Sequence, residues 1–279
     1  MQTAAANPEY DESPTRPLAL ITGASSGIGA AFARAYARRG VDVALVARRV
    51  DRLNRLADEI ARTNGVKAIV LPADLSASDA PQTIFREIKA RGRTVDILVN
   101  NAGFGVPQTF GRVPWERHRE FLMVSVAGPC ALTHEVLPEM VARRRGAIIN
   151  VSSITAMSPG AAGHTLYPAA KSFLLKFSQS LDAELREHGI RVTAVCPGFT
   201  RTEFHEANGT AALMERAPRR FWTSAEAVVE AAIAGNARGK TVVIPGWHNK
   251  LAVALMKYLP DGIVIPIIRA GAARYRVED

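Results

Sequence analysis

Apolar runs of strand length alternate along this chain with longer segments whose apolar residues recur at helical spacing. The helical segments between the first runs end at Gly40, Gly65 and Gly92, and glycine is the residue that most often terminates a helix. Strands that are apolar on both faces and alternate with helices are typical of a parallel sheet covered on both sides, so the pattern predicts an α/β fold. The expected strands are residues 17–22, 41–47, 66–73, 95–100, 146–153, 190–197 and 240–245.

The domain organisation follows from an even composition. No linker or shift in residue types divides the chain, so we expect a single domain over residues 17–247. Residues 1–16 mix proline, serine and acidic residues, which is typical of a flexible N-terminal arm. Residues 248–279 form a C-terminal extension of the domain.

Net charge narrows the choice of partners. The 279 residues include 35 Lys and Arg against 26 Asp and Glu, a formal net charge of +9, and 48% of them are hydrophobic, which is enough for a substantial core. The positive excess favours an anionic partner such as a phosphorylated cofactor, an acidic lipid surface or nucleic acid. The sequence has no zinc-finger spacing, RNP motif or basic stripe with interleaved aromatic residues, so nucleic acid is not the expected partner.

Cysteine usage and the chain ends indicate a reducing compartment. Cys130 and Cys196 lie far apart among apolar or small residues, without a CxxC spacing or a nearby histidine, so we expect buried thiols and no metal site. The N-terminus lacks the basic start and apolar stretch of a secretory signal. No uninterrupted apolar run reaches the ~18 residues of a membrane span, and the best stretch, 251–268, is broken by a lysine, a proline and an aspartate. We therefore expect a cytoplasmic protein with at most a peripheral membrane contact.

The glycine-rich stretch TGASSGIG, residues 22–29, follows the first expected strand and opens the first helix. Gly23, Gly27 and Gly29 allow a tight turn and the close approach of a ligand, because no Cβ stands in the way. The helix start then offers free N–H groups and the positive end of its dipole to a pyrophosphate. The stretch therefore predicts a dinucleotide site, although its spacing is G-x-x-x-G-x-G instead of the commoner G-x-G-x-x-G.

The end of the second strand indicates which dinucleotide binds. An acidic residue at this point usually holds the ribose 2′-hydroxyl of NAD. Here Ala47 stands in that place and is followed by Arg48 and Arg49. Because a guanidinium suits a 2′-phosphate, the sequence predicts NADP(H) over NAD(H), although two solvated arginines at a strand end are the alternative.

A tyrosine and a lysine stand four residues apart in YPAAK. On a helix, Tyr167 and Lys171 would share one face. A phenol with its ordinary pKa of about 10 is a poor base at neutral pH. A cation one turn away favours the phenolate, so we expect Lys171 to lower the pKa of Tyr167.

Six motifs in this order resemble the short-chain dehydrogenase/reductase family, and the match runs from about residue 17 to residue 245. The resemblance implies a Rossmann-like, doubly wound, mostly seven-stranded parallel sheet with the cofactor across the C-terminal ends of the strands. It also implies hydride transfer between a nicotinamide cofactor and a carbonyl or secondary alcohol. The motifs are TGASSGIG, Asp74 in PADLS, NNAG at 100–103, Ser153 in NVSS, YPAAK at 167–171 and CPGFTRT at 196–202.

The resemblance also implies roles for individual residues. Tyr167 would exchange a proton with the substrate oxygen, Ser153 would hold that oxygen, and Lys171 would bond the nicotinamide ribose. Asp74 would bind the adenine ring, and Asn101 belongs to the segment that lines the adenosine ribose. The expected cofactor-binding residues are Gly23, Ser25, Ser26, Gly27, Ile28, Gly29, Arg48, Arg49, Asp74, Leu75, Asn101, Ala102, Gly103, Tyr167, Lys171, Pro197, Gly198, Thr200 and Thr202.

The chain departs from the family pattern at two places. Ser125 stands where family members carry an asparagine that helps hold a water in a proton relay to the lysine. A serine hydroxyl is shorter and offers one donor instead of two, so we expect an altered relay or slow turnover. Ser153 precedes Tyr167 by 14 positions instead of the usual 13, which leaves Ser152 as an alternative active hydroxyl. These departures keep open a second function, an NADP(H)-binding redox sensor or scaffold with little turnover.

The last part of the chain bears on substrate and assembly. Residues 199–222 would form the family's flap over the substrate, and their aromatic and apolar residues predict a substrate with a hydrophobic body. Members often form homodimers or homotetramers, which we expect here too. Leu251, Leu255 and Leu259 would share a helix face, which could pack on the domain, bind a partner subunit or contact a membrane.

Overall fold

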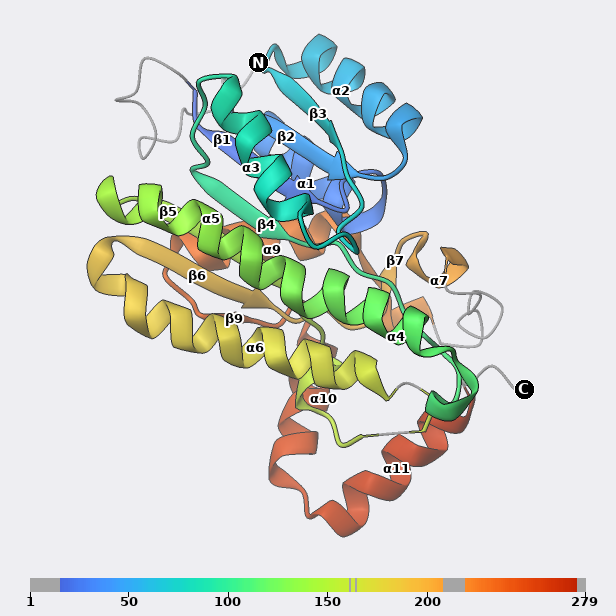
Figure 1. Ribbon diagram of the computed structural model, residues 1–279. Coiled ribbons are helices and arrows are strands. Elements are labelled where there is room, and N and C mark those ends of the chain that lie inside the picture. Colours follow the sequence, from blue (N-terminus) through green and yellow to red (C-terminus); the bar gives the residue numbers. More distant parts are fainter. Residues whose placement is uncertain (1–15, 161, 164, 208–218, 275–279) are drawn as a thin grey trace.

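The computed structural model of the chain describes residues 16–160, 162–163, 165–207 and 219–274. At its centre is a seven-stranded parallel sheet with the strand order β3-β2-β1-β4-β5-β6-β9 (Figure 1). All seven predicted strands are present, although the last is reduced to two residues. The strands are β1 (Leu18–Thr22), β2 (Asp42–Ala47), β3 (Ala68–Pro72), β4 (Ile97–Asn100), β5 (Gly146–Val151), β6 (Ile190–Val195) and β9 (Val242–Val243).

Helices cover both faces of the sheet, which confirms the doubly wound α/β architecture (Figure 1). Apolar side chains fill one core cluster on each face, because the strands are buried on both sides. The strand order reverses between β1 and β4, and such a switch point leaves a crevice at the C-terminal strand ends. The helices of one face are α1 (Gly27–Ala37), α2 (Val50–Asn64) and α9 (Ala225–Ala237), and those of the other are α3 (Ala80–Ala90), α5 (Gly128–Ala142) and α6 (Leu166–Leu185).

The three glycines predicted to terminate helices do so in left-handed backbone conformations. Gly40, Gly65 and Gly92 have φ angles of +76°, +63° and +66°. A side chain at such a φ would be strained, so glycine here ends each helix at a defined residue and returns the chain toward the sheet.

A buried chain of polar side chains joins two central strands to α6. Asn100 of β4 donates to the Asn150 side-chain oxygen of β5 over 2.9 Å, and Asn150 donates to the Ser178 hydroxyl over 2.8 Å. Ser178 in turn donates to the backbone oxygen of Leu174 over 2.7 Å. Buried polar groups that satisfy one another in this way fix α6 against the sheet, and α6 carries Tyr167 and Lys171 near its start.

A long helical stretch on the α6 side of the sheet changes its winding midway. It consists of α4 (Trp115–Leu122), a π-helical segment (Met123–Ala127) and α5. Among the described residues this stretch, 115–142, is the one that is long and apolar enough by composition to cross a membrane. That is weak support for a span, because core helices pass the same test, and its residues Leu132 and Met140 are buried against the sheet.

The C-terminal helices α10 (Trp247–Tyr258) and α11 (Asp261–Arg274) extend from the body of the sheet domain (Figure 1). Leu251, Leu255 and Leu259 are 52%, 48% and 37% exposed, so the interpretation that this face packs on the domain is wrong. The helix packs through Asn249 and Val253 instead.

Short 3-10 turns lie at Phe110–Arg112, Ile154–Met157 and Arg186–His188. Further short elements belong to the predicted flap, of which residues 208–218 lie outside the described residues. Its described parts include a two-stranded parallel sheet of β7 (Thr200–Arg201) and β8 (Thr223–Ser224) and the short helix α7 (Phe204–Ala207). The small sheet holds the backbone in place just after the CPG motif, residues 196–198.

Candidate functional site

The glycine loop lies at the C-terminal end of β1 and leads into α1. A Cβ on Gly29 would overlap the backbone oxygen of Gly23, and a Cβ on Gly23 would lie 2.9 Å from the Cα of Ala102. Gly23 and Gly27 also have φ angles of +66° and +55°. Ser26 is the N-cap of α1 and its side chain makes no capping bond, so the first turn keeps N–H groups for an anion. The loop therefore fits the pyrophosphate of a dinucleotide.

The NNAG segment is fastened to the glycine loop. The Thr22 hydroxyl accepts from the backbone N–H groups of Asn101 at 2.9 Å and Ala102 at 3.0 Å. The Asn101 amide donates to the Thr22 backbone oxygen over 2.9 Å. A Cβ on Gly103 would lie 3.9 Å from the Lys171 ammonium, so this segment bridges the glycine loop and the start of α6.

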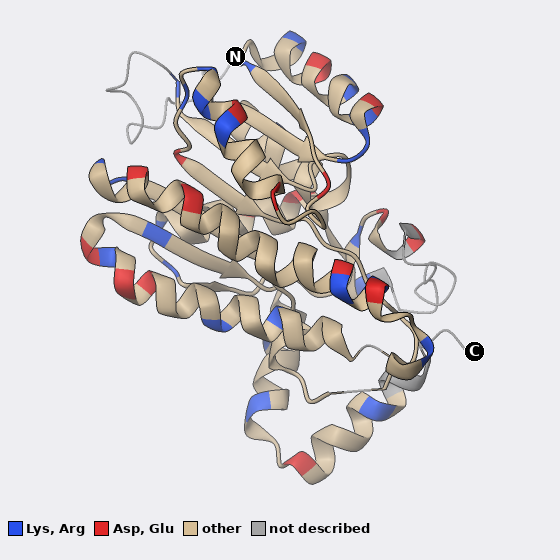
Figure 2. Cartoon of the chain, in the orientation of Figure 1, with Lys and Arg blue, Asp and Glu red and all other residues tan. Residues whose placement is uncertain are grey.

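Arg49 is the arginine that contacts the glycine loop, and it marks the basic end of the candidate site. Its guanidinium donates to the Ser25 hydroxyl at 2.9 Å and to the Ser26 hydroxyl at 2.7 Å. Figure 2 shows this basic loop between β2 and α2. Arg48 behaves differently, since its side chain is 71% exposed and its partner is Asp74, 3.8 Å away. The structure thus brings Arg49, and not Arg48, together with the glycine loop.

Asp74 is held as an ionised acceptor. Burial alone would raise its pKa, but Ser76 donates to the carboxylate through its backbone N–H at 2.9 Å and its hydroxyl at 2.8 Å. With the charge of Arg48 added, the pKa of Asp74 is lowered. The neighbouring Leu75 is buried in the core, and Ile28 of the glycine loop is partly buried against it.

The two adjacent serines have different partners. Ser152 is 3% exposed, and its hydroxyl donates to the backbone oxygen of Lys171 over 2.7 Å. The Ser153 hydroxyl is instead close enough to the Tyr167 phenol to lower its pKa, and it accepts from the Thr155 N–H at 3.2 Å. Ser153 is therefore the serine beside the tyrosine, despite the spacing of 14 residues.

Lys171 is buried and its ammonium donates to the Val151 backbone oxygen over 2.8 Å. Burial lowers its pKa to about 8, with a smaller opposing effect from Cys196. The ammonium lies 5.6 Å from the centre of the Tyr167 ring. Lys171 and Tyr167 thus share a helix face, as predicted, without a direct bond between their polar ends.

The prediction that Lys171 lowers the pKa of Tyr167 is wrong for this structure. Burial raises the pKa of Tyr167 to about 12, and the nearby Ser153 hydroxyl offsets that rise only in part. Removing a phenolate from water costs more free energy than the nearby polar groups recover. The Lys171 ammonium does not offset this cost, because it is directed at Val151 of the sheet. Tyr167 is therefore a protonated donor at neutral pH.

Ser125 lies in the π-helical segment and is 1% exposed. Its hydroxyl has no hydrogen-bond partner in the part of the chain that the structure describes. A buried polar group without a partner is uncommon, and π-helical segments occur often at functional sites. The segment contacts α6, the helix that carries Tyr167 and Lys171.

The CPG motif closes the other side of the crevice. Pro197 accepts from the Ile154 N–H at 3.0 Å, and the Thr200 hydroxyl donates to the Gly198 oxygen at 3.0 Å. A Cβ on Gly198 would overlap the side chain of Asn249 of α10. Sequence reasoning gave Asn249 no place here, because a residue far along the chain carries no local signal of this contact.

Aromatic rings line the described part of the flap. The Phe204 ring lies 6.0 Å from the Tyr167 ring, and the Phe199 and Trp222 rings are 5.7 Å apart. The predicted flap residues Leu213 and Met214 lie outside the described residues. Two charged residues absent from the sequence prediction, Arg52 and Glu203, form an ion pair beside Arg49.

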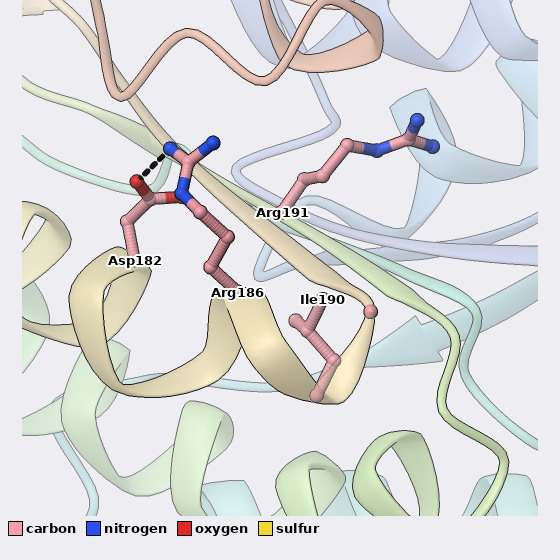
Figure 3. Close-up of a pocket in the computed structure, with 5 residues that line it drawn as sticks. Asp182, Arg186, Ile190 and Arg191 are labelled. Atoms are coloured by element: carbon pink, nitrogen blue, oxygen red, sulfur yellow. Dashed lines mark hydrogen bonds and ion pairs between the residues drawn. The ribbon is translucent and has the colours of Figure 1, made fainter.

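A second hollow lies far from these residues, at the start of β6 (Figure 3). It is lined by Asp182, Arg186 and residues 189–191, and the Asp182 carboxylate pairs with Arg186. This hollow lies at the N-terminal ends of the parallel strands, whereas the glycine loop lies at their C-terminal ends.

The chain matches the family model described as short chain dehydrogenase over residues 17–212. It is 37% identical to an uncharacterized oxidoreductase of Myxococcus xanthus, over 92% of this chain and 97% of that protein. A short-chain dehydrogenase from Sphingobium yanoikuyae, solved in complex with NADPH, superposes with a TM-score of 0.77 at 34% identity, covering 88% of this chain and 96% of that one.

A third relative is the bulky-bulky ketone specific alcohol dehydrogenase of Comamonas testosteroni, with a TM-score of 0.73 at 32% identity, covering 88% of this chain and 95% of that one. The seven-stranded parallel sheet with helices on both faces agrees with these matches. The chain is an oxidoreductase that belongs to the short-chain dehydrogenase family.

Proposed function

We propose that the protein is an NADP(H)-dependent oxidoreductase that transfers hydride between the nicotinamide and a carbonyl or secondary alcohol of a hydrophobic small molecule, with Tyr167 as the acid/base. The observation that carries this proposal is the grouping of Tyr167 with Ser153 and Lys171 at the end of the sheet where the glycine loop lies.

The residues around the glycine loop fit NADP(H). The first turn of α1 would bind the pyrophosphate, Asp74 the adenine, and Arg49 with Ser25 the 2′-phosphate. A guanidinium and hydroxyls suit a phosphate, and the missing acid at Ala47 removes the usual ribose 2′-hydroxyl partner. The NADPH complex of the Sphingobium relative supports this choice. Bound NADP(H) supplies or accepts the hydride.

The chain's own part is to bind the reacting oxygen and to move a proton. Ser153 would hold the carbonyl oxygen, and the Tyr167 hydroxyl would donate its proton to that oxygen. Burial raises the pKa of Tyr167 to about 12, so the phenol carries at neutral pH the proton that reduction of a carbonyl requires. Lys171 would hold the nicotinamide ribose through the ammonium protons that Val151 does not use.

Ser125 would hold a water that returns protons toward Lys171. Its buried hydroxyl supports this role, since it needs a hydrogen-bond partner that the described residues do not provide.

The substrate is inferred from the aromatic residues around Tyr167. Phe204, together with Phe199 and Trp222, offers apolar surface next to the proton donor. The ketone specificity stated for the Comamonas relative supports a carbonyl compound with bulky groups on both sides.

A substrate screen tests the proposal. NADPH fluorescence is followed while hydrophobic ketones and aldehydes are added, and alcohols are tested in parallel with NADP⁺. We expect consumption of NADPH with at least one bulky ketone and a lower Michaelis constant for NADPH than for NADH. Consumption with NADH preferred would refute the cofactor choice.

The second candidate is an NADP(H)-binding protein with little turnover. Ser125 at the asparagine position favours it, because a single hydroxyl holds a relay water less firmly. Binding of NADPH without consumption across the whole panel would support this candidate over the enzyme.

The assembly and domain limits complete the proposal. We propose a single domain over residues 17–247, a homodimer or homotetramer, and a cytoplasmic location. Analytical ultracentrifugation of the full chain tests the oligomer, and a purely monomeric protein would contradict it.

A further inference from the structure

Glu203 lies against the same guanidinium that the proposed function assigns to the 2′-phosphate. Its carboxylate is 3.3 Å from the Arg49 guanidinium and forms a second ion pair with Arg52. On its other side, Arg49 donates to Ser25 and Ser26. The hydrogen bond from Arg52, with a smaller contribution from Arg49, lowers the pKa of Glu203, so the carboxylate is ionised at neutral pH.

The position of Glu203 is fixed by its neighbours in the chain. It comes two residues after β7, which is paired with β8. The preceding Thr202 packs on the glycine loop, since a Cβ on Gly27 would lie 3.0 Å from the Thr202 Cβ. The Phe204 N–H donates to the Thr202 hydroxyl over 3.3 Å, which turns the backbone at this point. Glu203 is therefore held at the basic end of the site by ordered contacts on both sides.

A carboxylate and a phosphate cannot share these arginines without repelling each other. A 2′-phosphate brings up to two negative charges to Arg49, whereas the bare 2′-hydroxyl of NAD(H) brings none. NAD(H) could thus bind with the Glu203 pairs intact, but NADP(H) could not.

We propose that Glu203 is a competing anion that lowers the affinity of the site for NADP(H) relative to NAD(H), and that it withdraws from Arg49 and Arg52 when the 2′-phosphate binds. This inference rests on the proposed function, because it takes the 2′-phosphate to Arg49. It assigns Glu203 and Arg52 to cofactor selection.

The size of the effect follows from exposure. The side chains of Arg49, Arg52 and Glu203 are 46%, 39% and 44% exposed, so water and salt screen both pairs. Surface pairs of this kind contribute little each, and losing two of them corresponds to a change in dissociation constant of roughly three- to tenfold.

The test compares Glu203→Gln with Glu206→Gln in the full chain. Glu206 is an exposed residue of α7 only three positions away, so the control removes the same charge from the same segment. Dissociation constants for NADPH and NADH are measured by fluorescence, and those for 2′,5′-ADP and 5′-AMP by displacement. We expect E203Q to bind NADPH and 2′,5′-ADP about three- to tenfold more tightly, with less than a twofold change for NADH and 5′-AMP. The E206Q variant is expected to change none of the four constants by more than about twofold.

Each remaining outcome contradicts the inference. Unchanged or weaker NADPH binding by E203Q, while the parent protein binds NADPH normally, would overturn the role of Glu203 alone. An equal gain for NADPH and NADH would show a general charge effect, which also overturns it. A parent protein that binds neither dinucleotide would overturn the proposed function and this inference together.

Discussion

The Lys171 ammonium lies 2.8 Å from the backbone oxygen of Val151, the last residue of β5. This contact directs the lysine ammonium at the sheet instead of at the phenol. The lysine is only 6% exposed, and this burial lowers its pKa to about 8. The same residue is thus a structural donor before any cofactor binds.

This burial predicts a pH-dependent stability. Between pH 8 and the ordinary lysine pKa of about 10.4, the unfolded chain binds a proton at Lys171 that the folded chain does not. The free energy of unfolding of the parent protein therefore rises with pH in this range. We expect Lys171→Met to be more stable than the parent by roughly 1–3 kcal/mol at pH 7, with the gap closing by pH 10. Urea unfolding at several pH values measures it. The exposed Lys257→Met is the control, and a gap that does not change with pH would contradict the buried ammonium.

The two serines before α6 are predicted to differ in their effect on turnover. Ser153→Ala should lower kcat about a hundredfold, because it removes a donor to the reacting oxygen, and cost about 1 kcal/mol of unfolding free energy, because it also removes the acceptor of the Thr155 N–H. Ser152→Ala should cost about 1 kcal/mol of unfolding free energy, because it removes the bond to the Lys171 backbone, with a smaller loss of kcat. Steady-state kinetics distinguish them, and thermal unfolding measures both losses of stability. The reverse pattern would make Ser152 the active hydroxyl.

Ser125 is predicted to limit turnover. Ser125→Asn should raise kcat severalfold, because an amide offers two donors and reaches further, and Ser125→Ala should lower it. Turnover is compared in water and deuterium oxide, with unfolding midpoints as the check on folding. If the asparagine variant is no faster than the parent, Ser125 is not a weakened relay.

Arg49 is predicted to carry the preference for NADPH. Arg49→Ala should raise the Michaelis constant for NADPH about tenfold and hardly affect that for NADH, because a charge-assisted bond to the phosphate is lost. Arg62→Ala, at the exposed end of α2, removes the same charge away from the glycine loop. An equal loss for both cofactors would mean that Arg49 only supports the loop through Ser25 and Ser26.

Most of the fold could be predicted because its signals are local. Each buried strand is an apolar run, and the turns at Gly40 and Gly65 need a residue that tolerates a positive φ. The glycine loop is equally local, since Gly29 is required by the Gly23 oxygen only six residues away.

The parts that the sequence could not supply depend on contacts between distant residues. Glu203 meets Arg52 across 151 positions, and no periodicity indicates such a pair. The pKa of Tyr167 was predicted with the wrong sign, because spacing reveals the neighbouring lysine but not the burial that outweighs it. The exposure of Leu251 likewise follows from how α10 leaves the domain, which its helical periodicity does not determine.

The most direct test of the central claim is the single-turnover rate of NADPH oxidation by Tyr167→Phe with a ketone that the parent reduces. Tyr258→Phe, a 76% exposed tyrosine of α10, is the matched control. Loss of the proton donor should lower the rate by about 10²- to 10⁴-fold while NADPH still binds, and the control should match the parent. A Tyr167→Phe protein that oxidises NADPH at the parent's rate would contradict the account.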